Sequence, residues 1–265
     1  MKPVRKRYPL DPAEERTLAL DLVLTQLILL TLGAAGSFVV GLVEAGSFRG
    51  AVSGGFWWRS VIASLASRPP DETAASALLL LAVLLAVGGV GERLAWNTMG
   101  GRRSIVESRR GVNGEIARMR VPVFVVLMCV SGFAEELLFR YVLVGGVASA
   151  LELVVPRGAA ALTALAVSCV AFWLVHERYR DPFTTTLTLA LGLALGLAYL
   201  FSDSLAVVFI AHTAYDVADL VAERVKMRLE DDYFHGPAPA RAILDMLEER
   251  RGGEGHAAEE EMPSE

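Results

Sequence analysis

The sequence predicts an all-α protein: a polytopic bundle of about six transmembrane helices, with one further interfacial or re-entrant helix. Three observations lead to this fold class. Hydrophobic residues make up 54% of the 265 residues, and they lie in long runs instead of the short periodic patches of a soluble domain. Arginine-rich segments separate several of these runs. Ionisable residues interrupt the runs in the C-terminal half, where each is costly in hydrocarbon and is therefore a functional candidate.

A membrane span needs about 20 apolar residues, and six runs approach that length. They cover Leu18–Val43, Ala74–Val90, Val121–Val155, Gly158–His176, Phe183–Phe201 and Leu205–Ala222. A shorter stretch, Gly55–Ala66, contains Arg59 and two tryptophans. We interpret it as the interfacial or re-entrant helix, because tryptophan favours the headgroup level. The first run is too long for the apolar region of a signal peptide, so we expect no cleavable signal.

Positive charge gathers at alternate ends of these spans. It is concentrated in residues 1–16, in residues 92–120 with their seven arginines, in the link after the fourth span and in the stretch after the sixth. Because cytoplasmic loops carry the excess of lysine and arginine, we expect both termini in the cytoplasm. We expect an integral protein of the plasma membrane. The short chain, with only three lysines, favours a prokaryotic source.

The chain divides by composition into three parts. Residues 1–120 hold the N-terminal spans and an arginine-rich loop, residues 121–222 hold the membrane core with the ionisable residues, and residues 223–265 form an acidic cytoplasmic tail. In the tail, Ala240–Arg251 has the spacing of an amphipathic helix, and the last dozen residues have the composition of disordered segments. Cys129 and Cys169 lie in apolar runs, so we expect buried thiols and no disulfide.

The first cluster of ionisable residues is Glu135-Glu136, followed by Arg140. Glu136 and Arg140 are four residues apart, so they share a helix face, and pairing keeps both charged in hydrocarbon at a tolerable cost. Glu135 is turned away by about 100° and is expected to have no partner in its own helix. Such a carboxylate is suited to act as a general base or acid. The alternative is that both glutamates only join helices.

Two further clusters each contain a histidine. Phe172 and His176 lie on one face of the fourth span, where the alternative is a plain interfacial histidine. His212 and Asp216, again four residues apart, lie on one face of the last span. An imidazole and a carboxylate at this spacing can bind a metal, polarise a water or hold a proton relay. The alternative is a hydrogen bond that only joins two helices.

Several other patterns are weaker. His176-Glu177 begins like the zinc motif H-E-x-x-H, but Arg180 stands where the second histidine is required. Gly192 and Gly196 form a G-x-x-x-G, which favours helix packing. No membrane serine lies within G-x-S-x-G, and no G-x-G-D accompanies Tyr215-Asp216. Serine and aspartyl mechanisms are therefore not supported.

Taken together, the three clusters resemble the CPBP family, the CAAX-protease and bacteriocin-processing intramembrane proteases, also called the Abi family. The family pattern is E-E-x-x-x-R, then F-x-x-x-H, then H-x-x-x-N or H-x-x-x-D, each on a separate membrane helix. The chain matches it with Glu135-Glu136 and Arg140, Phe172 and His176, and His212 and Asp216, over about Val121–Ala222. The resemblance implies a membrane hydrolase, an intramembrane metalloprotease of the CAAX-prenyl-endopeptidase type. Its substrate would be a membrane-associated peptide or protein.

The resemblance also implies a role for each residue. Glu135 and His176 would activate a water, Glu136 and Arg140 would hold the helix in register, and His212 and Asp216 would stabilise the oxyanion or bind metal. A divalent metal such as zinc would take His176, His212, Asp216 and Glu135 as ligands. Characterised relatives favour asparagine where this chain has Asp216. Because an ionised aspartate cannot donate a hydrogen bond, Asp216 would be protonated, orient His212 or bind metal.

Two other functions are compatible with the same residues. A proton- or ion-coupled transporter could use the same carboxylates, but the chain shows no internal repeat of the kind found in many transporters. A non-catalytic scaffold of the same family would keep the fold without the reaction. As partners we expect the lipid bilayer and a membrane-associated substrate, and no nucleic acid. The sequence indicates no particular oligomeric state.

The depth of Glu135 constrains the third span. If that span began at Val121, Glu135 would lie about 21 Å along the helix, at 1.5 Å per residue. His176, at the cytoplasmic end of its own span, would then be too far away. We therefore predict a break or bend near Ser131-Gly132, and a site reached from the cytoplasmic side.

Overall fold

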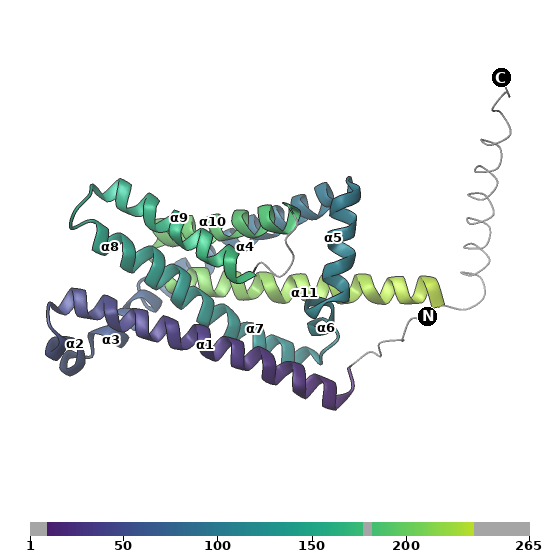
Figure 1. The fold of residues 1–265 in the computed structure, drawn as a ribbon, viewed down its shortest axis with the longest axis horizontal. Coiled ribbons are helices and arrows are strands. Elements are labelled where there is room, and N and C mark those ends of the chain that lie inside the picture. The colour runs from purple at the N-terminus through teal and green to yellow at the C-terminus, as the bar shows by residue number, and fades with distance from the viewer. Residues whose placement is uncertain (1–9, 177–181, 236–265) are drawn as a thin grey trace, which may run out of the picture. The chain divides into compact units, whose positions relative to one another are not determined.

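The computed structural model describes residues 10–176 and 182–235, and all regular structure in these residues is helical (Figure 1). Among them, six helices are long and apolar enough to cross a membrane. These are α1 (Pro12–Ala45), α4 (Pro70–Trp96), the composite helix Val121–Leu151, α9 (Arg157–His176), α10 (Pro182–Ser202) and the first 24 residues of α11 (Leu205–His235). The predicted polytopic helical bundle is confirmed, and the protein is an integral membrane protein.

The ends of α1 follow from its local sequence. Asp11 caps the helix, because its side chain accepts a hydrogen bond from the backbone N–H of Ala13 at 2.9 Å. Pro12 occupies the first helical position, where its missing N–H costs no hydrogen bond. Gly46 ends the helix in the left-handed conformation, with φ of 62°, which glycine adopts without strain.

The third span changes helix type along its length. Its parts are α7 (Val121–Glu136), the π-helix η1 (Leu137–Gly146) and α8 (Val147–Leu151). π-Helical turns are rare and frequently lie at functional sites, and here the π-helix begins directly after Glu135-Glu136. The predicted break near Ser131-Gly132 is wrong, because α7 runs without interruption through both residues.

Gly132 lies at a close contact between two helices. A Cβ atom at this position would lie 2.5 Å from Oγ1 of Thr213 on α11, so a larger residue would force the Thr213 side chain or the helices to shift. The composite span has 31 residues, which is about 46 Å at 1.5 Å per residue and exceeds the roughly 30 Å of the hydrocarbon core. A span longer than the hydrocarbon would let part of α7 lie outside it, and Glu135 could then lie at the depth of His176 without a break.

Four short helices in the described residues connect the spans: α2 (Phe48–Gly54), α3 (Phe56–Leu65), α5 (Met99–Arg110) and α6 (Val112–Ile116). α3 covers the segment predicted to be interfacial or re-entrant, and its 10 residues are too few to cross a membrane. It packs against α1, and its Ser60 hydroxyl donates to Glu44 of α1 at 2.8 Å. The arginine-rich segment 92–120, between the second and third spans, contains α5 and α6, for which no helix was predicted.

The buried core lies where α4, η1, α10 and the first turns of α11 meet. It consists mainly of apolar side chains: Ala77, Leu80, Leu84, Leu137, Tyr141, Val144, Leu195, Tyr199, Leu205, Val207, Val208 and Ala211. The core residues of α11 end directly before His212. Apolar packing therefore fixes the position of His212 relative to η1, which directly follows Glu136.

Contacts along the chain divide it into residues 1–220 and residues 221–265. The second unit is described only to His235, as the continuation of α11. The predicted amphipathic helix Ala240–Arg251 and the predicted disordered end lie outside the described residues. Both cysteines are free, as predicted, but Cys129 is exposed and Cys169 is half-buried, so the expectation of two buried thiols is wrong.

Candidate active site

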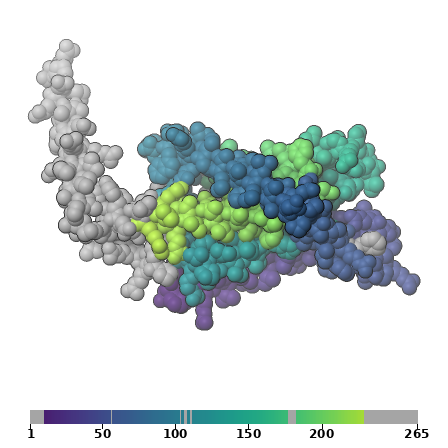
Figure 2. Space-filling view, turned by 180° about the vertical axis from the view of Figure 1, so that it is seen from behind, coloured from purple at the N-terminus to yellow at the C-terminus, as the bar shows by residue number. Residues whose placement is uncertain are grey.

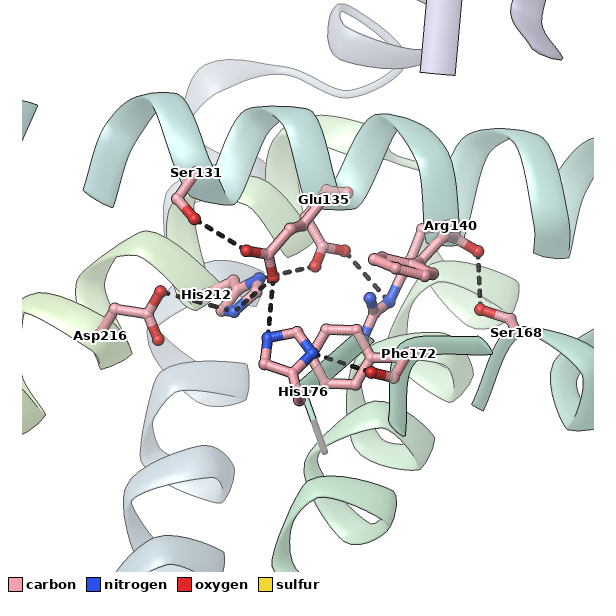
Figure 3. A network of polar contacts seen from close by, with 10 residues as sticks. Ser131, Glu135, Arg140, Ser168, Phe172, His176, His212 and Asp216 are labelled. Carbon is pink, nitrogen blue, oxygen red and sulfur yellow. Dashed lines mark hydrogen bonds and ion pairs between the residues drawn. The ribbon is translucent and has the colours of Figure 1, made fainter. Parts of the chain in front are cut away.

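Glu135 lies near the end of α7, with its carboxylate almost fully buried. Its Oε1 accepts a hydrogen bond at 2.7 Å from the hydroxyl of Ser131, one turn earlier in the same helix. Its Oε2 faces two imidazoles, at 3.4 Å from Nε2 of His176 and 4.0 Å from Nε2 of His212 (Figure 3). The expectation that Glu135 has no partner in its own helix is therefore wrong. Ser131 fixes which oxygen faces the histidines.

Glu136 is fully buried and holds two groups at once. Its Oε2 lies 3.2 Å from Nε of Arg140, one turn later in the chain. Its Oε1 lies 2.7 Å from Nδ1 of His212 on α11. Because a carboxylate can only accept, His212 donates its Nδ1–H to Glu136, and its Nε2 is directed toward Glu135. The spacing predicted the contact with Arg140 but not the contact with His212.

Arg140 links η1 to α9. Its side chain is 1% exposed, and its guanidinium carbon lies 4.5 Å from the centroid of the Phe172 ring, a cation–π contact. A second link is close by, because the Ser168 hydroxyl of α9 donates to the backbone carbonyl of Phe139 at 2.7 Å. The motif around Phe172 is thus attached directly to the motif around Glu136.

His176 is oriented by Phe172. Its Nδ1–H donates to the backbone carbonyl of Phe172 at 2.8 Å, which leaves Nε2 directed at Glu135. The two rings lie against each other with centroids 4.2 Å apart. A Cβ atom at Gly192 of α10 would lie 3.2 Å from the Phe172 ring, and one at Gly196 would lie 2.4 Å from Leu165 of α9. The G-x-x-x-G therefore serves helix packing, as predicted.

Asp216 lies one turn after His212, with Oδ2 at 3.5 Å from Nε2 of His212. The Asp216 side chain is 26% exposed and that of His176 is 35% exposed, whereas that of Glu135 is 8% exposed. The cluster is therefore accessible from the side of His176 and Asp216. A cavity of about 100 Å³ adjoins that side and is lined by Leu84, Phe172, His176, Thr188, Leu191, Leu195, His212, Tyr215 and Asp216.

The structure brings the predicted metal ligands Glu135, His176, His212 and Asp216 into one cluster. Within residues 10–176 and 182–235, however, no three histidine, cysteine, aspartate or glutamate side chains are arranged to hold a metal ion. Metal binding by these four residues stays a prediction.

Sequence reasoning missed three contacts of the site. The first, between Ser131 and Glu135, spans four residues and could have been found from helical spacing alone. The other two, between Glu136 and His212 and between Arg140 and Phe172, join different helices. No periodicity within one helix reveals such contacts.

Residues 117–218 match the model of a protein family described as type II CAAX prenyl endopeptidase Rce1-like. The matched segment contains all six residues predicted for the site, and it covers α7, η1, α8, α9 and α10 in full. Comparisons with curated proteins and with solved structures gave no match. The family description names a CAAX-type protease, which agrees with the class that the three motifs predicted. Residues 117–218 are therefore similar to the type II CAAX prenyl endopeptidase Rce1-like family.

Proposed function

We propose that the protein is an intramembrane endopeptidase that hydrolyses a peptide bond of a membrane-associated peptide or protein. One observation carries the proposal: Oε2 of Glu135 and Nε2 of His176 lie 3.4 Å apart on the accessible side of a buried cluster. A water held by both atoms is placed for general-base activation. The family match of residues 117–218 supports the reaction class.

In the proposed reaction Glu135 is the general base and His176 holds the water. Glu135 takes a proton from the water as the water oxygen attacks the peptide carbonyl carbon. The same proton then passes to the leaving amine as the C–N bond breaks. Ser131 contributes by binding Oε1, so that the other oxygen of Glu135 is the one that meets the water.

His212, protonated on both ring nitrogens, is proposed to donate from Nε2 to the negative charge that develops on the carbonyl oxygen. Its Nδ1 is bonded to Glu136, so Nε2 is the atom directed into the cluster. An ionised Asp216 cannot donate to an oxyanion, so we assign it the role of orienting His212 from 3.5 Å away. On the buried side, Glu136 binds His212 and Arg140 contacts Phe172, so the three motifs stay joined.

We further propose that the protein lies in the cell membrane with both termini in the cytoplasm, and that substrate enters from the side of His176 and Asp216. An even number of spans supports the placement of the termini on one side. The concentration of arginine in residues 92–120 supports the choice of the cytoplasmic side.

The test is cleavage of a fluorogenic membrane-peptide library by purified protein in detergent. We expect Glu135→Gln and His176→Ala each to lower the cleavage rate by at least about 100-fold, with thermal unfolding unchanged. Glu152→Gln is the matched control, because Glu152 is an exposed carboxylate that pairs with Arg157 at 3.6 Å, and it is expected to cleave like the wild type.

Cleavage by Glu135→Gln at the wild-type rate would contradict the proposal. A folded wild type that cleaves nothing but moves protons or ions across liposomes would identify a transporter instead. A strong chelator decides the metal question: inhibition that zinc reverses would assign a metal to the cluster, and unchanged activity would support the water held by Glu135 and His176 alone.

A further inference from the structure

A second and larger cavity, of about 600 Å³, lies between α4 and α10, which are neighbours on the face shown in Figure 2 (α4 blue, α10 green). Ala190 and Ala194 of α10 leave room for it, since they are four residues apart on one helix face. Leu79 of α4 and Leu193 of α10 border it and are 69% and 44% exposed. Exposed apolar side chains on a membrane span face hydrocarbon, so this groove opens toward lipid.

The polar groups of the groove lie toward one end. Arg68 precedes α4, Ser202 ends α10 and Ser76 lies in the second turn of α4. Nε of Arg68 donates to the backbone carbonyl of Ser202 at 2.9 Å. This hydrogen bond holds the guanidinium at the polar end of the groove. Its Nη1 lies 3.9 Å from the exposed carboxylate of Glu72. Such a distant surface pair is weak and leaves the guanidinium able to bind another anion.

The length of the groove matches one leaflet of a bilayer. Its lining extends along α10 from Ala190 to Ser202, which is about 18 Å at 1.5 Å per residue. Half of the hydrocarbon core is about 15 Å thick. The polar end coincides with the ends of two spans, where headgroups lie, and the apolar part extends inward from it.

We propose that this groove is a binding site for one phospholipid of the bilayer. An acyl chain lies along Ala190 and Ala194, and the phosphate is bound by Arg68, whose planar fork suits phosphate oxygens. The volume lies within the range of small-ligand sites. The inner end, at Val83 and Ala190, is adjacent in the chain to Leu84 and Leu191 of the active-site cavity. The bound chain would support that shared wall, but the proposal does not depend on the proposed reaction.

The experiment is native mass spectrometry of the delipidated full-length protein with phosphatidylglycerol or with diacylglycerol of the same chains. We expect the wild type to bind one phosphatidylglycerol more tightly than diacylglycerol. Ala194→Phe fills the groove and is expected to weaken both ligands at least tenfold. Arg68→Ala is expected to weaken phosphatidylglycerol severalfold and to leave diacylglycerol unchanged. The matched controls are Ala159→Phe and Arg49→Ala, at exposed positions outside the groove, and both are expected to bind like the wild type.

Equal binding of phosphatidylglycerol by Ala194→Phe and Ala159→Phe, or by Arg68→Ala and the wild type, would overturn the proposal. A second measurement uses the wild type alone, so that its result does not depend on whether a variant folds. In bilayers that contain a phospholipid with a photoreactive acyl chain, we expect adducts concentrated on peptides of α4 and α10. Adducts spread equally over the exposed faces of α1 and α9 would also overturn it.

Discussion

At the level of single residues, four carboxylate oxygens account for the geometry of the site. Oε1 of Glu135 binds Ser131, and Oε2 faces the histidines. Oε2 of Glu136 pairs with Arg140, and Oε1 binds His212. Adjacent helix positions point about 100° apart, so two neighbouring glutamates meet different surroundings. One holds the helices together, and the other is directed at the accessible side.

Ser131→Ala tests whether the orientation of Glu135 matters. Without the hydroxyl, Oε1 loses a hydrogen bond to a charged group, and the carboxylate can rotate away from His176. We expect kcat to fall about tenfold, the equivalent of roughly 1.4 kcal/mol, with KM unchanged and with recovery in Ser131→Thr. Ser53→Ala is the control, because that hydroxyl donates to a backbone carbonyl on the surface. An unchanged kcat in Ser131→Ala would show that packing alone orients Glu135.

Two substitutions of Asp216 test what it means that this chain has aspartate where characterised relatives favour asparagine. Asparagine can accept from His212 and can also donate to an oxyanion, so we expect Asp216→Asn to keep kcat/KM within about threefold of the wild type. Asp216→Ala removes both capacities and is expected to lose at least about tenfold, or roughly 1.4 kcal/mol of transition-state stabilisation. Comparison of kcat/KM for the three proteins gives the answer. An equal loss in both variants would mean that the negative charge itself is required.

At the level of elements, the site depends on how closely α7 and α11 approach. Gly132 of α7 faces Thr213 of α11, and both residues adjoin residues of the site. Arg140, on the π-helix that begins after Glu136, contacts the Phe172 ring of α9. The site is therefore assembled by three helices whose separations are fixed by small residues and buried contacts.

Gly132→Ala tests this close approach. The added Cβ would lie 2.5 Å from the Thr213 Oγ1, and overpacking of this kind costs about 1–3 kcal/mol. We expect a lower thermal unfolding temperature, with recovery in the double variant Gly132→Ala/Thr213→Ala. Gly89→Ala is the control, because a Cβ there meets nothing within 4 Å and is expected to be neutral or stabilising by up to about 1 kcal/mol. Equal melting of both glycine variants would contradict the packing argument.

The elements also show what the sequence could predict. The six spans followed from apolar length, and the pairing of Glu136 with Arg140 followed from helical spacing. The continuous α7 was not predicted. The depth argument placed Val121 at the membrane boundary, but the composite span is longer than the hydrocarbon is thick. The helices α5 and α6 were not predicted, because the arginine-rich connection between the second and third spans was considered only for its charge. The contact between Glu136 and His212 was missed because the two residues are 76 positions apart and nothing in one sequence records that proximity.

At the level of the whole molecule, the proposed orientation can be tested with cysteines in a variant that lacks Cys129 and Cys169. Arg49 and Met99 are exposed and lie at opposite ends of the predicted topology, separated by α4. With both termini in the cytoplasm, we expect Arg49→Cys to react with a membrane-impermeant maleimide in intact cells. Met99→Cys is expected to react only after permeabilisation. The reverse pattern would invert the topology.

The separation of tasks between Glu135 and Glu136 also provides a tool. A Glu135→Gln protein lacks the proposed base but retains Glu136, Arg140 and the contact with His212, so its three helices stay joined. Such a protein can serve as bait in living cells, holding its natural peptide uncut long enough for covalent capture and recovery with the bait. Identification of the captured chain would then reveal which protein the site acts on. The capture takes place in the membrane, where enzyme and substrate normally meet.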